Sequence, residues 1–164
     1  MATALAHTAI CVPDVEAAVA WYQSALGLRV LSPAYLMAGE AIERDMGELV
    51  PSPVVVKAAI LGFAADDRVL EVIEYPNARG AAQATTAVVD TGLTHIGLVC
   101  DDVERERARL VDAGATALTR GMADVAGLRT TWVRDPFGVT WILLQKSAPE
   151  RPYWHQHAPI DDRR

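Results

Sequence analysis

The sequence is short of cysteine and of long apolar segments. Only two of its 164 residues are cysteines, Cys11 and Cys100. Two cysteines do not build a disulfide framework, so each is expected to be a small buried hydrophobic residue, and the cytoplasm is the expected location. No stretch approaches the roughly 18 apolar residues of a membrane-spanning helix. Residues 1–10 also lack the charged start and apolar core of a secretory signal.

The sequence also lacks a basic run, and its formal net charge at pH 7 is −6. This balance argues against non-specific binding to nucleic acid or to anionic membranes, because no cationic surface would attract them. With 51% hydrophobic and 22% charged residues, the composition is that of an ordinary globular domain. A chain of this length can bury a core without disulfides or a structural metal.

One motif is present twice. Residues 7–16 read HTAICVPDVE, and residues 94–104 read THIGLVCDDVE. In both, a histidine opens an apolar run of strand length, and Asp-Val-Glu begins seven positions after it. Asp14 is suited to cap a helix in the first copy, and Asp101 or Asp102 in the second. The repeat predicts two related modules.

Each half of the sequence predicts a strand, a helix and three further strands. In the first half the helix ends at Gly27, and the strands are expected at 5–12, 28–32, 54–63 and 69–75. In the second half the helix ends at Gly114, and the strands are expected at 93–100, 115–119, 128–135 and 139–145. Residues 33–53, rich in proline and glycine, are expected to be an insert.

The predicted organisation is one domain followed by a tail. The domain covers residues 1–146, with module one at about 1–76, a connection at 77–92 and module two at 93–146. The tail, residues 147–164, has no periodicity and is expected either to be free or to cross to a neighbouring subunit.

Two histidines and one glutamate are unusual in their apolar strands. His7 and His95 hold equivalent positions in the repeat, so a pseudo-two-fold relation between the modules would turn both toward a common cavity. Glu71 shares a strand face with apolar residues, whereas Glu74 lies on the other face. Burying an unpaired carboxylate is costly, and coordination to a cation would remove that cost. These three residues are therefore candidate functional residues.

The chain resembles the vicinal oxygen chelate superfamily, which includes glyoxalase I, methylmalonyl-CoA epimerase, extradiol dioxygenases and antibiotic-resistance proteins. The epimerase-like and glyoxalase-like members are the most similar. The resemblance covers residues 5–146 and rests on four stretches: HTAICVPDVEAAVAWYQSALGLRV, LEVIEY, GLTHIGLVCDDVERERARLVDAGA and VRDPFGVTWILLQ. It implies an α+β fold in which two βαβββ modules pair into one curved, cleft-forming sheet.

The resemblance also implies a divalent-metal site. Metal-binding members that resemble glyoxalase use His, Glu or Gln, His and Glu, and three of these match His7, Glu71 and His95. The fourth ligand would fall seven residues after Asp135, where this chain has Ile142. Two histidines and one carboxylate suit Zn, Mn, Co, Ni or Fe.

Three consequences of Ile142 stay open. The three remaining ligands can hold the metal by themselves. Alternatively, His155 or His157 of the tail replaces the missing ligand, since Gln145 lies on the opposite strand face from Ile142. In the third case the metal has been lost, and the cleft binds a ligand without chemistry.

The leading functional hypothesis is a metal-dependent lyase or isomerase of the glyoxalase or epimerase type. It would polarise vicinal oxygens of a small metabolite, with a CoA thioester among the candidates. The alternatives are a non-haem iron ring-cleaving dioxygenase and a metal-free, ligand-sequestering protein of the resistance type. Without a carboxylate at position 142, Glu43 of the insert is the first candidate for a general base. The resemblance further implies a homodimer. Four cations could meet an anionic group of the substrate: Arg44, Lys57, Arg129 and Arg134.

Overall fold

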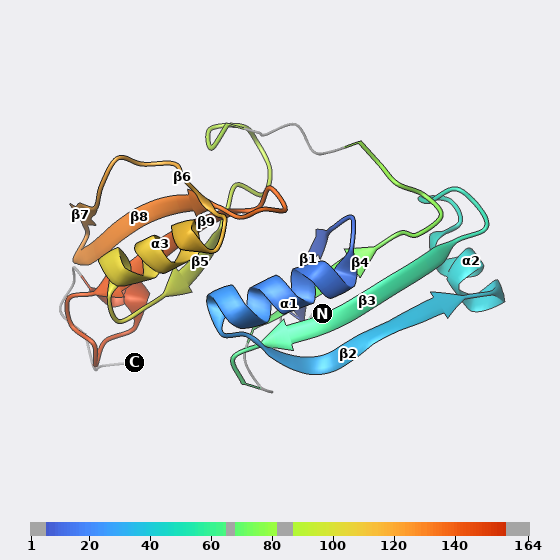
Figure 1. Ribbon diagram of the computed structural model, residues 1–164, viewed down its shortest axis with the longest axis horizontal. Coiled ribbons are helices and arrows are strands. Elements are labelled where there is room, and N and C mark those ends of the chain that lie inside the picture. Colours follow the sequence, from blue (N-terminus) through green and yellow to red (C-terminus); the bar gives the residue numbers. More distant parts are fainter. Residues whose placement is uncertain (1–5, 65–67, 82–86, 157–164) are drawn as a thin grey trace. The chain divides into compact units, whose positions relative to one another are not determined.

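The computed structural model describes residues 6–64, 68–81 and 87–156, and it divides into two compact units (Figure 1). The first unit is Met1–Ala82 and the second is Gln83–Arg164. The boundary lies inside the segment 77–92 that the sequence predicts as the connection. Each unit has a β-sheet with a helix packed against it, which is the predicted α+β architecture.

The first unit is built on a mixed sheet with the strand order β1-β4-β3-β2. Its elements are β1 (His7–Cys11), α1 (Val15–Leu26), β2 (Arg29–Ala38), α2 (Glu40–Met46), β3 (Val55–Gly62) and β4 (Val69–Glu74). Strand β1 runs parallel to β4, and the other neighbours are antiparallel. Because strand side chains alternate, Leu70 and Val72 point to the side of α1, where both are buried, and Glu71 points to the opposite side.

The helix α1 has two acidic acceptors at its N-terminus. The Asp14 carboxylate accepts a hydrogen bond from the Ala17 amide at 2.9 Å, as expected from the sequence. The Glu74 carboxylate accepts a second one from the Val15 amide at 3.0 Å, and this bond fixes α1 to the end of β4. At the C-terminus, Gly27 has φ 70°, a conformation that favours glycine. Within the part of the chain that the structure describes, no helix is long and apolar enough to cross a membrane.

The insert expected at residues 33–53 has more regular structure than predicted. Strand β2 continues through Pro33 to Ala38, and α2 follows. Proline is tolerated here because β2 is an edge strand and its register shifts around this position, so no neighbour needs the missing N–H. The strand expected at 28–32 therefore extends six residues further than predicted, to Ala38.

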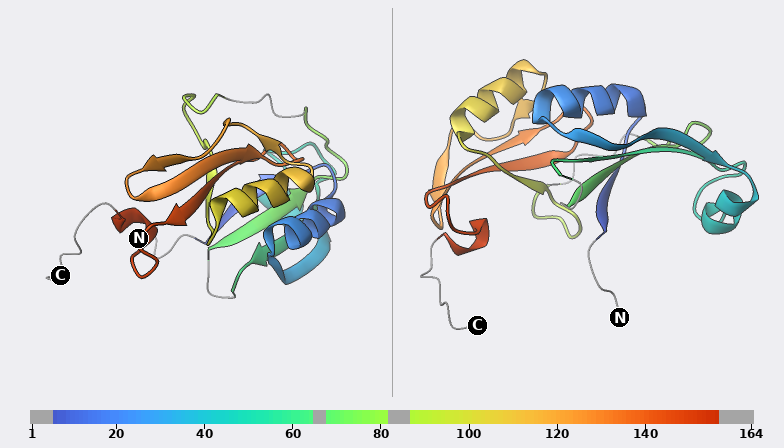
Figure 2. Two further views of the ribbon diagram at one scale, coloured as in Figure 1. Left: turned by 60° about the vertical axis from the view of Figure 1, so that its left-hand side comes forward. Right: turned by 90° about the horizontal axis from the view of Figure 1, so that it is seen from below.

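The helix α2 covers part of the sheet face that α1 leaves open (Figure 2). Ile42 and Met46 of α2 pack on the buried side chains of Val56 and Ala58. Ala58 is in register with Ile73, which lies on the same face as Glu71. One end of the Glu71 face is thus closed by apolar side chains.

The second unit repeats the arrangement of the first. Its sheet has the order β5-β9-β8-β6, and β7 pairs with β8 on the same side as β6. The elements are β5 (Ile96–Val99), α3 (Val103–Asp112), β6 (Thr116–Ala117), β7 (Ala123–Val125), β8 (Leu128–Arg134) and β9 (Thr140–Lys146). Strand β7 was not predicted, and β6 is shorter than the expected 115–119. Asp102, rather than Asp101, caps α3, and its carboxylate accepts from the Arg105 amide at 3.0 Å.

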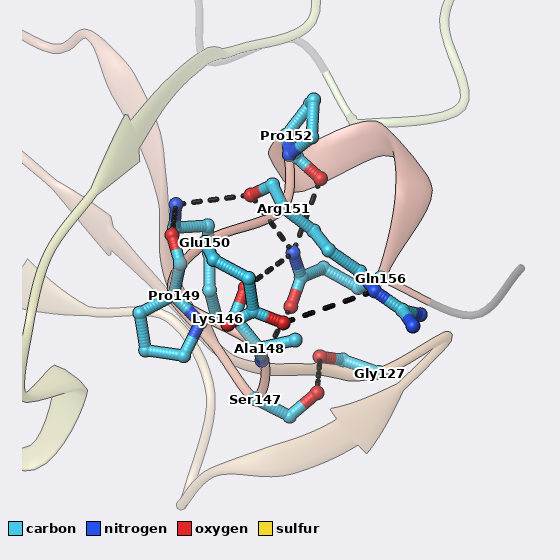
Figure 3. Close-up of polar contacts among 9 residues, drawn as sticks. All are labelled: Gly127, Lys146, Ser147, Ala148, Pro149, Glu150, Arg151, Pro152 and Gln156. Carbon is cyan, nitrogen blue, oxygen red and sulfur yellow. Dashed lines mark hydrogen bonds and ion pairs between the residues drawn. The ribbon is translucent and has the colours of Figure 1, made fainter. Parts of the chain in front are cut away.

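The end of the described chain folds onto the second unit through Gln156 (Figure 3). The side chain is buried, and its amide oxygen accepts a hydrogen bond from the Ala148 amide at 2.8 Å. Its amide nitrogen donates to three backbone carbonyls at 3.0 to 3.1 Å, those of Ala148, Arg151 and Pro152. One buried glutamine therefore organises the loop that precedes it.

Gly127, in the turn between β7 and β8, allows the chain end to approach closely (Figure 3). A Cβ atom at this position would lie 2.8 Å from the Gln156 carbonyl oxygen, and the backbone has φ +76°. Residues 147–156, predicted as a tail, thus pack on their own unit and include the short 3-10 helix η1 (Tyr153–His155). His155 is exposed, and His157 lies outside the described residues.

Candidate functional site

The two units place Glu71 and Ile142 at equivalent points. In the first unit Glu71 is in register with Ala9, and in the second unit Ile142 is in register with Gly97. Ala9 and Gly97 each follow the histidine of their strand by two positions. The isoleucine therefore occupies in the second unit the position of the glutamate in the first, as the count from the D-P-x-G turn predicts.

His7 and Glu71 lie together on the sheet face away from α1. The Nε2 atom of His7 is 3.1 Å from Oε2 of Glu71. The side chains are 46% and 21% exposed, so solvent and ligands can reach the pair. Ile60 is in register with Glu71, and Ile73 lies two residues further along the same face. A carboxylate with apolar neighbours is stabilised by a cationic or metal partner. His7 and Glu71 together offer one nitrogen and one oxygen that could ligate the same metal ion.

His95 precedes β5 and is held by two neighbours in the second unit. The Thr94 hydroxyl is 2.6 Å from its Nδ1 atom. The Trp132 ring contacts the imidazole edge-on, with ring centroids 4.8 Å apart and planes at 73°. With Nδ1 engaged, Nε2 is the nitrogen left for a metal, and such a partner on the other nitrogen is typical of metal-binding histidines. The convergence of His95 with His7 and Glu71 stays a prediction, because His95 belongs to the other unit.

Glu43, the candidate general base, binds the segment before β3. Its carboxylate accepts hydrogen bonds from the Ser52 hydroxyl at 2.6 Å and from the Val54 amide at 2.7 Å. The Ser52 hydrogen bond and then the Val54 hydrogen bond lower the pKa of Glu43, because both stabilise the charged form. A lower pKa makes a carboxylate a weaker base, so these contacts support a structural role. Its catalytic role stays a prediction.

Another acidic group lies at the start of α1, on the helix side of the sheet. Asp14, Glu16 and Glu74 bring one carboxylate oxygen each within 4.8 Å of one another, close enough to hold a metal ion. Each already has a protein partner, since Asp14 and Glu74 accept from helix amides and Glu16 forms an ion pair with Lys57. Negative charge is also favourable at a helix N-terminus. The group is therefore explained by helix capping through Asp14 and Glu74 and by the ion pair of Glu16.

Sequence reasoning missed the partners of the site residues. Thr94 carries no recognisable spacing, and only the fold reveals its contact with the adjacent imidazole. Tyr75 packs beside Ile73 on the Glu71 face, and burial, followed by the charges of Cys11 and Glu71, raises the pKa of its phenol. Cys11 was expected to be buried and is instead exposed, because it lies on the edge strand β1 and points away from α1.

The sequence and the fold together define the family. Residues 4–143 match the family model of the Glyoxalase/Bleomycin resistance protein/Dioxygenase superfamily. The chain therefore belongs to this superfamily, and the predicted resemblance and the vicinal oxygen chelate fold are confirmed. Members of the superfamily commonly use divalent metals.

Several solved structures have a similar fold. A glyoxalase family protein from Bacillus cereus has a TM-score of 0.77 at 17% identity, and the match covers 88% of this chain and 94% of the other. The trypanothione-dependent glyoxalase I of Leishmania major has a TM-score of 0.59 at 22% identity, with 88% of each chain covered. Glyoxalase I from Zea mays has a TM-score of 0.61 at 19% identity, covering 90% of this chain and 46% of the plant chain. No curated protein matches the sequence.

Proposed function

We propose that the protein is a divalent-metal enzyme of the glyoxalase or epimerase type, and that His7, Glu71 and His95 hold its metal. The observation that carries the proposal is the approach of His7 Nε2 to Glu71 Oε2, 3.1 Å apart on an accessible face with apolar neighbours. A binding cleft without metal would have no need of a carboxylate at this place. The metal would be Zn, Mn, Co, Ni or Fe.

The chain's own residues would bind and orient a small oxygenated metabolite. A divalent cation, when bound, supplies a Lewis acid that polarises two neighbouring oxygens and makes an adjacent C–H acidic. The apolar side chains around Glu71 and below α2 would exclude water from one side of the substrate. Glu43 is the proposed base for the proton: its hydrogen bonds keep it as the carboxylate, the form that accepts a proton, although the lowered pKa makes it a weaker base.

Ile142 supports two alternative functions. It removes the carboxylate that the family usually supplies from the second module, which is consistent with a ligand-sequestering protein. The composition of two histidines and one glutamate is also that of a non-haem iron dioxygenase site. Oxygen uptake with bound iron would favour the dioxygenase. Exchange of a substrate C–H with deuterated solvent, with another metal bound, would favour the isomerase.

The first prediction concerns the metal itself. Protein purified without chelator should contain about one divalent ion per chain, as measured by elemental mass spectrometry. Glu71→Gln and His95→Ala should each lower the affinity for that ion by at least about 10-fold, since even changes next to metal ligands have effects of this size. His155→Ala should keep the metal, because His155 lies exposed on η1, and loss of the metal in this variant would instead assign the fourth ligand to the tail.

The proposal fails if the wild type is free of metal and still binds its ligand. Retention of the ion in both Glu71→Gln and His95→Ala would also contradict the assigned ligands. We further propose that the protein is cytoplasmic and forms a homodimer. Light scattering of the purified chain measures its oligomeric state.

A further inference from the structure

Of the four cations that the sequence offers for an anionic substrate group, three have a carboxylate partner. The pairs are Arg44 with Glu40, Lys57 with Glu16, and Arg129 with Glu104. The fourth is Arg134, whose side chain has no hydrogen bond or ion pair with another described residue. Its Nε atom is moreover buried without a hydrogen-bond partner.

Arg134 ends β8 on the face that also carries His95. Thr131 and Val133 are each 1% exposed beneath α3, so strand alternation turns Trp132 and Arg134 to the opposite face. Trp132 contacts the His95 ring, which places the histidine on the same side of the sheet. All of these residues belong to the second unit, so their arrangement does not depend on the first.

The nearest residues of β9 on this face, Thr140 and Ile142, offer Arg134 no opposite charge. Arg134 is in register with Thr140, and Ile142 lies two residues further along β9 on the same face. A carboxylate at position 142 would be a diagonal neighbour within reach of the guanidinium. The isoleucine supplies no acceptor, and a buried charged donor that lacks one costs free energy.

We propose that Arg134 binds an anionic group of the substrate, a carboxylate or a phosphate. A guanidinium has donors only, in a planar fork that fits two oxygens of such a group. Thr140 adds a hydroxyl in the same row of the sheet. This inference rests on the proposed function in one respect, since it takes the His95 face as the side where the substrate binds.

The test is a titration of the ¹⁵N-labelled full chain, followed by NMR, with malonate and separately with inorganic phosphate. Malonamide, which has the same shape without the charge, is the neutral control. At least one anion should shift the resonances of Trp132 and Thr140, and malonamide should not. Which anion binds distinguishes a carboxylate from a phosphate.

The substitution Arg134→Gln should weaken anion binding by about 10-fold or more, because charge-assisted hydrogen bonds are lost. Arg129→Gln, on the α3 side of the same strand, should bind as the wild type does. Arg134→Lys keeps the charge and should recover part of the affinity, so it decides the question if Arg134→Gln does not fold.

Two results would overturn the inference: neither anion shifts these resonances, or Arg134→Gln binds as tightly as the wild type. Measuring metal content in the same samples separates this inference from the proposed function. If the protein is free of metal but binds anions through Arg134, the proposed metal enzyme is wrong and the anion site stands. If His95→Ala loses the metal and no anion binds, the metal site stands and the anion site is wrong.

Discussion

Two glutamates of the first unit illustrate how neighbours decide what a side chain does. Glu71 has apolar neighbours on an open sheet face, and within the described residues its polar partner is the His7 imidazole. Glu43 accepts two hydrogen bonds and holds the segment before β3. The first therefore suits a ligand-binding role, whereas the contacts of the second are those of a structural residue.

We expect Glu43→Gln to lower the stability of the protein at neutral pH. The pKa of Glu43 is lowered in the folded state, so its carboxylate stabilises the fold fully at pH values above the ordinary value of 4.5. That contribution is lost as the pH falls through the lowered pKa, so the difference between wild type and variant should shrink in acid. Chemical denaturation across a pH series measures it. Glu48→Gln, an exposed change in the same insert, should have no such effect.

The same variant tests the catalytic role of Glu43. Loss of a general base typically lowers turnover by about 100-fold or more. Such a loss with intact metal content would support the proposed base, and unchanged turnover would remove Glu43 from the mechanism.

At the residue scale, the sequence revealed residues whose type is unusual for their strand. His7 and Glu71 could be recognised from the internal repeat and from strand alternation, and Ile142 from the count that the family resemblance supplies. The importance of Arg134 could not, since it depends on which other cations find a carboxylate in the folded chain. Pairing across distant elements is not encoded in local spacing.

At the scale of the element, the two long helices begin in the same way. The Glu74 carboxylate accepts from the Val15 amide, and the Gln145 amide oxygen accepts from the Val103 amide at 3.0 Å. Each acceptor follows by three residues the position held by Glu71 or Ile142 in its strand. A residue on the helix side of the last strand thus adds a tertiary bond to each local aspartate cap.

We expect Asp102→Ala to destabilise the second unit by about 1 kcal/mol, the usual effect of losing an N-cap. Asp101→Ala is a matched control next to it, because Asp102 is the residue whose carboxylate accepts from α3. Thermal or urea unfolding of both variants measures the difference. Equal stability of the two variants would contradict the assignment of the cap.

The helices α1 and α3 were predicted more reliably than the insert, where α2 and the second half of β2 were missed. Asp14 and Gly27 mark the ends of α1 with side-chain and backbone chemistry that is local. The path of β2 through Pro33 depends on its position at the sheet edge, which is known only once strand order is known. The added strand β7 likewise pairs only through its contact with β8.

At the scale of the whole molecule, the chain is a duplication whose end is bound back onto the second copy. The repeat of His and Asp-Val-Glu predicted two modules, and four longer stretches carried the family resemblance. The role of residues 147–156 was not predictable, because it depends on one buried glutamine and on the space left by Gly127.

We expect Gln156→Ala to destabilise the protein by about 2 kcal/mol, since the variant leaves several backbone groups of the loop without partners. Residues 147–156 should then become more sensitive to proteolysis, which mass spectrometry of the fragments detects. Tyr153→Ala, an exposed change on η1, is the control. Unchanged protection in Gln156→Ala would show that other contacts hold the loop.

The exchange of Glu71 for Ile142 between the two copies gives the protein an internal reference. The second half has an isoleucine at the register position that the glutamate holds in the first half, and in each half a histidine lies two residues before the strand residue in register with that position. Titration curves and ligand affinities measured for the sheet of the first unit can be compared with those of the second. The contribution of one carboxylate on an apolar sheet face to ligand affinity can thus be measured within a single chain.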